Sequence, residues 1–163
     1  LKAIGLVQRW LLNYSQWLPK HNHAVFLTKY DLLASKGDSS TQGMAYVGTM
    51  CHIGDSVSIV EDIGGMATAI VAIHEIVHSL GAYHDGINLS EDCDERMNYI
   101  MAPLISGSED EQKFSNSFKL SKCSIRQIEM FLASLPGELI TKQRQCAISF
   151  GSHYGICAVS LTF

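Results

Sequence analysis

The stretch His74-Glu75-Ile76-Val77-His78-Ser79-Leu80-Gly81-Ala82-Tyr83-His84-Asp85 has the spacing of a metal site built on a helix and the loop that follows it. His74 and His78 are four residues apart, so on a helix they share one face. Glu75 turns toward the adjoining face, where its carboxylate can reach an activated water without binding the metal. His84 can join the same ion only if the helix ends first. Gly81 provides that end, because glycine adopts the left-handed conformation at little cost.

The three histidines predict a zinc ion with one open coordination position. Imidazole is a preferred ligand of zinc, and three protein ligands leave room for water and substrate. Zinc activates water and polarises a carbonyl oxygen, while Glu75 would act as the general base. The alternative is a chance H-E-x-x-H on an ordinary helix, which leaves Gly81 and His84 without a role. The pattern therefore favours hydrolysis by zinc-activated water.

The same stretch resembles the extended zinc motif of the metzincin endopeptidases, H-E-x-x-H-x-x-G-x-x-H. The Asp85 that follows is typical of the reprolysin (adamalysin or ADAM-type) branch. Tyr99-Ile100-Met101-Ala102-Pro103 resembles the Met-turn of that family. Further reprolysin-like segments run from Gly43-Met44-Ala45 to Cys51 and from Phe114-Ser115 to Cys123-Ser124. The resemblance covers roughly residues 1–146. Within the family, the sequence most resembles the secreted metalloproteases of tick saliva.

The resemblance implies a mixed α/β (α+β) zincin. We expect a twisted mixed sheet, a long active-site helix beneath a cleft, and an irregular C-terminal subdomain ending in a helix. It implies that Met101 packs beneath the histidines and that Asp85 is a buried structural residue. The strand that starts at Gly43 would line the cleft edge and pair with an extended substrate. Residues 99–103 would form a wall of a specificity pocket.

Two features depart from the reprolysin pattern, and four histidines lie outside the zinc motif. Val77 stands where relatives usually carry glycine, so a larger side chain must fit beside the active-site helix. An N-terminal partner strand is missing from the sequence, which makes a calcium ion near Asp31 doubtful. The remaining histidines have no ligand spacing and are predicted at the surface or in loops: His21, His23, His52 and His153.

Five cysteines predict disulfides and an oxidising compartment, because none forms C-x-x-C and histidines already supply the metal site. Free buried cysteines in a cytosolic protein are the alternative. Spacing alone does not give the connectivity. The resemblance implies the pairs Cys51–Cys146 and Cys93–Cys123, with Cys157 left over. The triplets at Asn13 and Asn88 match the N-x-S glycosylation signal.

Composition places the chain among single globular domains. It has 163 residues, 47% hydrophobic residues and a formal net charge of -4. Lys and Arg are few and scattered, so no nucleic-acid partner is expected. No apolar run is long enough to span a bilayer. The chain opens on Leu1 and reads as a fragment. We expect residues 1–146 to be the catalytic domain and 147–163 to be a non-native tail or the start of another domain.

Hydrophobic periodicity predicts the elements between these motifs. Helical spacing runs over residues 3–18, and a short apolar run at 24–28 is typical of a buried strand. A loop at 34–43 precedes strands at 44–47 and 56–61, with Val57 and Ile59 on one face. A largely apolar helix follows at about 66–80, and residues 82–121 are irregular. Ser124 and Gln127 resemble a capping box at the start of a final helix to Leu135.

These observations predict a secreted zinc-dependent endopeptidase with ligands His74, His78 and His84 and the base Glu75. If the protein is salivary, the resemblance implies extended extracellular substrates, from the matrix or from haemostasis. The main alternative is a non-catalytic module of the same fold that binds host extracellular proteins. A different zinc hydrolase, such as an amidase, is the third hypothesis. The complete set of site residues argues against the binding module.

Overall fold

The structure, a computed structural model, describes residues 2–19, 21–33, 35, 38–52, 54–104 and 108–135. Contacts divide the chain into a unit of residues 1–133 and a second unit of residues 134–163. The predicted tail at 147–163, His153, Cys146 and Cys157 lie outside the described residues.

A three-stranded mixed sheet carries the fold. Its strands are β1 (Ala24–Thr28), β2 (Gly43–Ala45) and β3 (Val57–Glu61), in the order β1-β3-β2. β1 runs parallel to β3, and β2 runs antiparallel to it. The predicted mixed sheet is confirmed, and β1 has the predicted bounds. β2 was predicted at residues 44–47. It begins one residue earlier, at Gly43, and ends two residues earlier, at Ala45.

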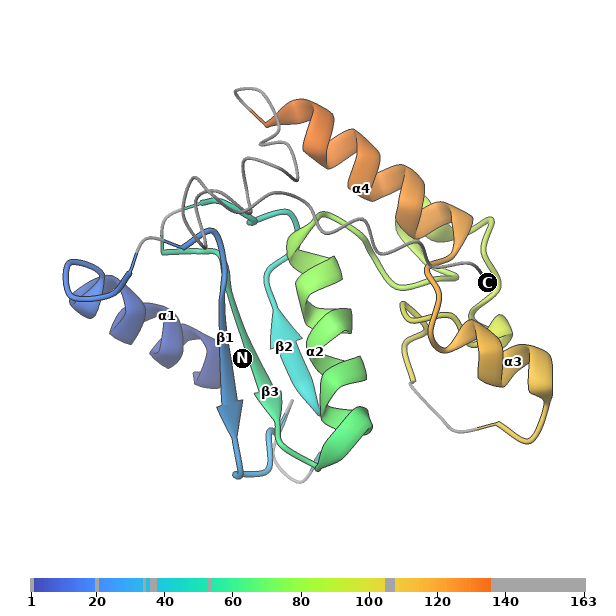
Figure 1. Ribbon diagram of the computed structural model, residues 1–163, viewed down its shortest axis with the longest axis horizontal. Helices are drawn as coiled ribbons and strands as arrows, with labels where there is room; N and C mark the ends of the chain where they lie inside the picture. The colour runs from blue at the N-terminus through green and yellow to red at the C-terminus, as the bar shows by residue number, and fades with distance from the viewer. Residues whose placement is uncertain are drawn as a thin grey trace, which may run out of the picture. The chain divides into compact units, whose positions relative to one another are not determined.

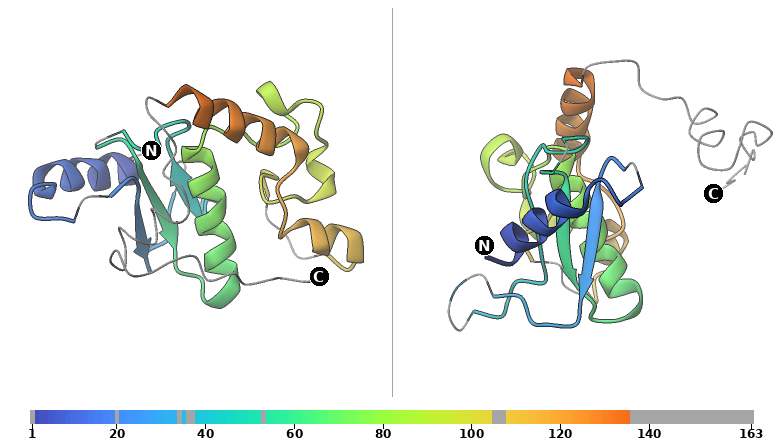
Figure 2. Two further views of the ribbon diagram at one scale, coloured as in Figure 1. Left: turned by 45° about the horizontal axis from the view of Figure 1, so that its top comes forward. Right: turned by 90° about the vertical axis from the view of Figure 1, so that its left-hand side faces the viewer.

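Helices α1 (Lys2–Tyr14) and α2 (Gly65–Ser79) cover opposite faces of this sheet (Figures 1 and 2). Ile4 and Leu11 of α1 form one core cluster with Val57 and Ile59 of β3. The other two central residues of β3, Ser58 and Val60, are buried as well. The prediction of one buried face on this strand was therefore incomplete, because a central strand between two helices is buried on both faces.

The prediction that β1 is a buried strand was wrong for one of its faces. Ala24 and Phe26 pack against the cluster beneath α1, but Val25 and Leu27 are exposed. The reason is the sheet order. β1 lies at one edge, whereas α2 packs against β3 and β2 on the other face. A short apolar run does not reveal which of its two faces a helix will cover.

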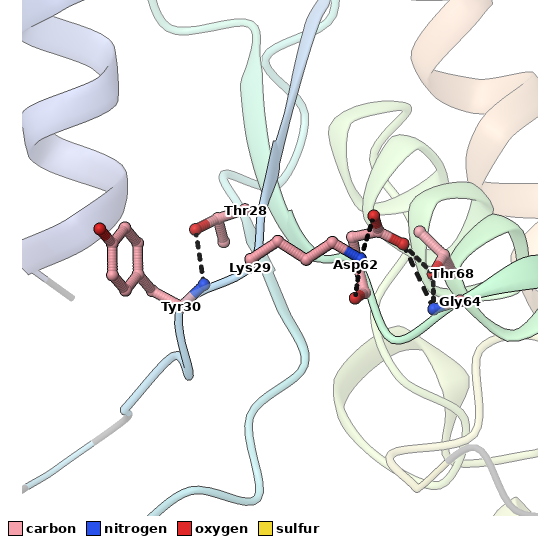
Figure 3. Close-up of polar contacts among 6 residues, drawn as sticks. All are labelled: Thr28, Lys29, Tyr30, Asp62, Gly64 and Thr68. Atoms are coloured by element: carbon pink, nitrogen blue, oxygen red, sulfur yellow. Dashed lines mark hydrogen bonds and ion pairs between the residues drawn. The ribbon is translucent and has the colours of Figure 1, made fainter.

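The entry to α2 is held by a polar cluster around Asp62, shown in Figure 3. Its Oδ1 accepts hydrogen bonds from the Gly64 amide and the Thr68 hydroxyl, both at 3.3 Å. Its Oδ2 lies 2.8 Å from Nζ of Lys29, which directly follows β1. This lysine holds the pKa of the Asp62 carboxyl below its usual range. The cluster thus ties the start of the helix to the sheet beside it.

The irregular C-terminal part contains two short 3-10 turns and two helices. The turns are Asn88–Ser90 and Glu95–Met97, and the helices are α3 (Glu111–Asn116) and α4 (Lys122–Ser134). The sequence pattern missed α3, which is shorter than two turns and whose first-turn amide at Lys113 donates to the Asp110 carboxylate.

The capping-box prediction at Ser124 and Gln127 was wrong. α4 begins earlier, and the amide of Ser124 donates to the hydroxyl of Ser121 at 3.2 Å. Ser121 is therefore the capping residue of this helix. The side chain of Gln127 is buried and makes its hydrogen bonds to the Tyr83 amide, the Ser90 hydroxyl and the Cys123 carbonyl.

One predicted disulfide is present. Cys93 and Cys123 are bonded and join the irregular segment to the first turn of α4. Cys51 is exposed, and its predicted partner Cys146 lies outside the described residues. Within the part of the chain that the structure describes, no helix is long and apolar enough to cross a membrane.

Candidate metal centre and cleft

The C-terminal half of α2 carries two of the predicted ligands, and the turn after it brings in the third. α2 ends at Ser79, and Gly81 has a φ of +93°. Its amide donates to the carbonyl of His78 at 2.8 Å, and the amide of Ala82 donates to the carbonyl of Val77. This left-handed turn reverses the chain as predicted. It places His84 beside the helix that it has just left.

The side chains of His74, His78 and His84 meet at one point. Nε2 of His84 lies 3.0 Å from Nε2 of His74 and 3.0 Å from Nε2 of His78. These three residues form a group that could hold one metal ion, with all ligand atoms within 4.8 Å of one another. The structure thus brings together the three histidines that the sequence pattern selected.

The hydrogen bonds behind the imidazoles show that this donor set fits a cation. Nδ1 of His74 donates to the carbonyl of Ile100, and Nδ1 of His78 donates to the carbonyl of Ala82, each at 2.7 Å. A carbonyl oxygen only accepts, so both protons sit on Nδ1 and both Nε2 atoms are lone-pair acceptors. The single Nε2 of His84 cannot donate to both. A cation would satisfy all three nitrogens.

Burial keeps these imidazoles neutral, which is the form that binds metal. Removal from water lowers the pKa of His74 to about 3 and that of His78 to about 4. Burial also lowers the pKa of His84. Neutral imidazole is the ligand that zinc requires, so no proton has to be displaced at neutral pH.

Glu75 lies in a cleft of about 300 Å³ beside the histidines. Its side chain is 5% exposed, and burial raises its pKa to about 8. A cation at the neighbouring imidazoles would favour the charged carboxylate. Gly43 and the three residues before it line the cleft on one side, and Pro103 and Leu104 line it elsewhere. The cleft therefore joins the β2 edge, the histidines and the end of the predicted Met-turn.

The loop of His84 is held by residues far away in sequence. The amide of Asp85 donates to the carbonyl of Met101 at 2.8 Å, and Asp85 Oδ1 accepts from Ser121 at 2.7 Å. The amide of Tyr83 donates to Oε1 of Gln127 at 3.1 Å. Asp85 is fully buried, as the resemblance implied. Sequence reasoning missed the part played by Gln127, because two of its partners, Tyr83 and Ser90, are more than thirty residues away.

Met101 and Val77 belong to one core cluster beneath the site. Met101 is fully buried, and Val77 is 5% exposed. Both pack with Ala82 and Ile100. Val77, which stands where the resemblance leads us to expect glycine, is accommodated in this cluster.

Of the other histidines, the three that the structure describes are not part of the site. His21 and His52 are exposed, as predicted. His23 lies in the loop just before β1, as predicted, and is half-buried. Its ring nitrogens lie 2.9 Å from the Ser56 hydroxyl and 3.0 Å from the Ser58 hydroxyl.

Comparison with known proteins agrees with this geometry. The sequence profile of the reprolysin (M12B) family of zinc metalloproteases matches residues 2–143. The chain belongs to the reprolysin family. Reprolysins are zinc metalloproteases that cleave polypeptides, and the three histidines provide a group that could bind the metal. The predicted family and the mixed α/β fold are thereby confirmed.

Three relatives show how the chain compares with longer reprolysins. "A disintegrin and metalloproteinase with thrombospondin motifs 2" from Homo sapiens is 32% identical, over 88% of this chain and 12% of that protein. Number 3 of the same series, also human, is 30% identical over 96% of this chain and 13% of that protein. "A disintegrin and metalloproteinase with thrombospondin motifs like" from Bombyx mori is 30% identical, over 79% of this chain and 23% of that protein. The chain thus spans a small part of these relatives.

Proposed function

We propose that this chain is the catalytic part of a secreted zinc endopeptidase, with His74, His78 and His84 as the zinc ligands and Glu75 as the general base. The observation that carries the proposal is that three neutral imidazoles converge on one point, and that two of them, His74 and His84, line one cleft with the Glu75 carboxylate. Residues 1–146 would form the catalytic domain, in keeping with the extent of the family match. The complete set of groups favours catalysis over a module that only binds proteins.

The residues of the cleft account for each proton transfer in peptide hydrolysis. Zinc bound to the histidines would supply water activation and polarise the scissile carbonyl. The Glu75 carboxylate would accept a proton from the attacking water as its oxygen bonds to the carbonyl carbon. The same carboxyl would then deliver that proton to the leaving nitrogen as the carbon–nitrogen bond breaks. The carbonyls of Ile100 and Ala82 would keep the two helix imidazoles oriented meanwhile.

An extended substrate would bind along β2. This strand pairs with β3 on one side, and Gly43 with its neighbours lines the cleft on the other. A free strand edge offers backbone groups to which an extended peptide can add. Pro103 and Leu104 would contact a substrate side chain, and their character favours an apolar one.

Secretion and the nature of the substrates are further parts of the proposal. The Cys93–Cys123 disulfide is typical of proteins that fold in an oxidising compartment. Extracellular matrix or haemostatic proteins are the proposed substrates, in line with the resemblance to tick salivary metalloproteases. A zinc hydrolase acting on amides other than peptides is the second candidate. A calcium ion near Asp31 is not part of the proposal.

The direct test is proteolysis with and without a chelator. The folded protein would be incubated with fibrinogen, gelatin and casein, and the products separated by electrophoresis. We expect cleavage that a zinc chelator abolishes and added zinc restores. Binding to these proteins with no cleavage at any zinc concentration would instead support the non-catalytic module.

The replacement Glu75→Gln separates the base from the metal. It keeps the shape of the side chain but removes the basic carboxylate, so turnover should fall about 10²- to 10⁴-fold. Zinc content should stay near one ion per chain, because no ligand is changed. Peptide turnover and zinc would be measured on one preparation, with Glu129→Gln on the exposed side of α4 as the control. Normal turnover would refute the base, and lost zinc would make Glu75 a ligand.

A further inference from the structure

Gly43 of β2 lies directly against the carboxylate of Glu75. A methyl group on Gly43 would stand 2.5 Å from Oε1, 2.7 Å from Cγ and 2.9 Å from Cδ of that side chain. Carbon and oxygen atoms in contact are normally separated by well over 3 Å. No other heavy atom comes as near to this position as these three. Any side chain at Gly43 therefore competes with Glu75 for the same space.

The backbone does not explain why glycine stands here. Six of the glycines that the structure describes have a positive φ, among them Gly48 and Gly81, but Gly43 is not one of them. It sits in a strand opposite Val60, where a residue with a side chain would stabilise the sheet better. What glycine contributes at this position is the space for its neighbour.

We infer that Gly43 is a positioning residue for the general base, because its missing side chain sets where the Glu75 carboxylate can lie. The inference rests on the proposed function of Glu75. The surroundings leave the outer part of the Glu75 side chain, Cγ with the carboxylate that it carries, as the part that must move. β2 is hydrogen-bonded to β3, and the amide of Gly48 just beyond it donates to the carbonyl of His78 at 3.0 Å. Both backbones are thus fixed, while the end of the glutamate side chain borders the open cleft.

Gly43→Ala should therefore lower kcat and leave the metal centre intact. A displacement of about 1 Å in a reacting group typically costs about 10²-fold in rate, and we expect a fall of that order. KM, zinc content and the midpoint of urea unfolding should change little, because the imidazoles and the backbone stay in place. Gly5→Ala is the matched control, since nothing lies within 4 Å of a methyl group there. Wild-type kcat in Gly43→Ala, or a loss of zinc from it, would overturn the inference.

A double-mutant experiment separates positioning of the base from a general disturbance of the cleft. Alanine at position 75 removes Cγ, Cδ and the carboxylate oxygens, and so leaves room for a methyl group on residue 43. Because Gly43 acts through Glu75, Gly43→Ala should cost far less of the residual turnover in the Glu75→Ala background than in the wild type, as a double-mutant cycle would show. Equal losses in the two backgrounds would refute the coupling.

A crystal structure of Gly43→Ala keeps this inference distinct from the proposed function. We expect the Glu75 carboxylate to be displaced relative to the wild-type crystal structure, with the three imidazoles unmoved. An unmoved carboxylate would overturn the inference whatever the activity. A wild-type protein that cleaves no peptide at any zinc concentration would refute the proposed function, and the displacement would still be measurable.

Discussion

At the scale of single residues, the orientation of each imidazole decides whether the site can bind metal. Nδ1 of His78 is held by the carbonyl of Ala82, so its Nε2 lone pair points to the other two histidines. His78→Ala should remove zinc, because two ligands cannot complete the site. The measurement is atomic emission on protein equilibrated with sub-stoichiometric zinc, with the exposed His52→Ala as the control. Full occupancy in His78→Ala would mean that the ligands are wrongly assigned.

His23 should make the stability of the protein depend on pH. Burial, and secondarily the charge of His21, lowers its pKa in the folded chain, so the unfolded chain binds the proton at higher pH. Its contribution to stability is complete above about pH 6.5 and is lost as the pH falls below that value. His23→Gln should therefore flatten the decrease in unfolding free energy between about pH 7 and pH 5. Urea unfolding in excess zinc would test this, and a slope equal to that of His52→Gln would contradict it.

At the scale of elements, α4 holds the loop that carries the third histidine. Gln127 accepts from the amide of Tyr83 and donates to the hydroxyl of Ser90 at 2.6 Å. Gln127→Ala would leave the buried Ser90 hydroxyl and the part-buried Tyr83 amide without this partner, so the unfolding free energy should fall by roughly 1–3 kcal/mol. Zinc affinity should fall about 10- to 100-fold, because the support of His84 is weakened. Competition with a chromogenic chelator measures this, with Glu129→Ala on the same helix as the control. Unchanged zinc affinity would limit Gln127 to a role in folding.

At the scale of the whole molecule, disulfides should tie together segments that are far apart in the chain. Cys93–Cys123 is present in the structure, and we predict a second bridge from the exposed Cys51 to Cys146. Closing so long a loop should stabilise the fold by about 3 kcal/mol, which is typical of a disulfide. Peptide mapping of the unreduced protein should recover both links. A peptide joining Cys157 to Cys123 would overturn this connectivity.

The metal-site pattern, α2 and the bounds of β1 could be predicted because each depends on residues close together in the sequence. His74 and His78 share a helix face through the helical repeat alone, and Gly81 ends that helix through its own backbone. β2 and the start of α4 were less predictable. The bounds of β2 and the first residue of α4 depend on which residues supply the hydrogen-bond partners. For α4 that residue is Ser121, whose hydroxyl accepts from the amide of Ser124.

The sequence by itself determined which residues could form a zinc centre, because ligand type and helical spacing are local properties. Only the tertiary structure decided which face of β1 is exposed, where Gln127 acts and what lies against Glu75. These features come from contacts between segments that the chain brings together only on folding. Gly43 and Glu75 illustrate the difference, since they are thirty-two residues apart and yet occupy adjoining space. No periodicity encodes such a contact, because packing in a core is set by shape in three dimensions.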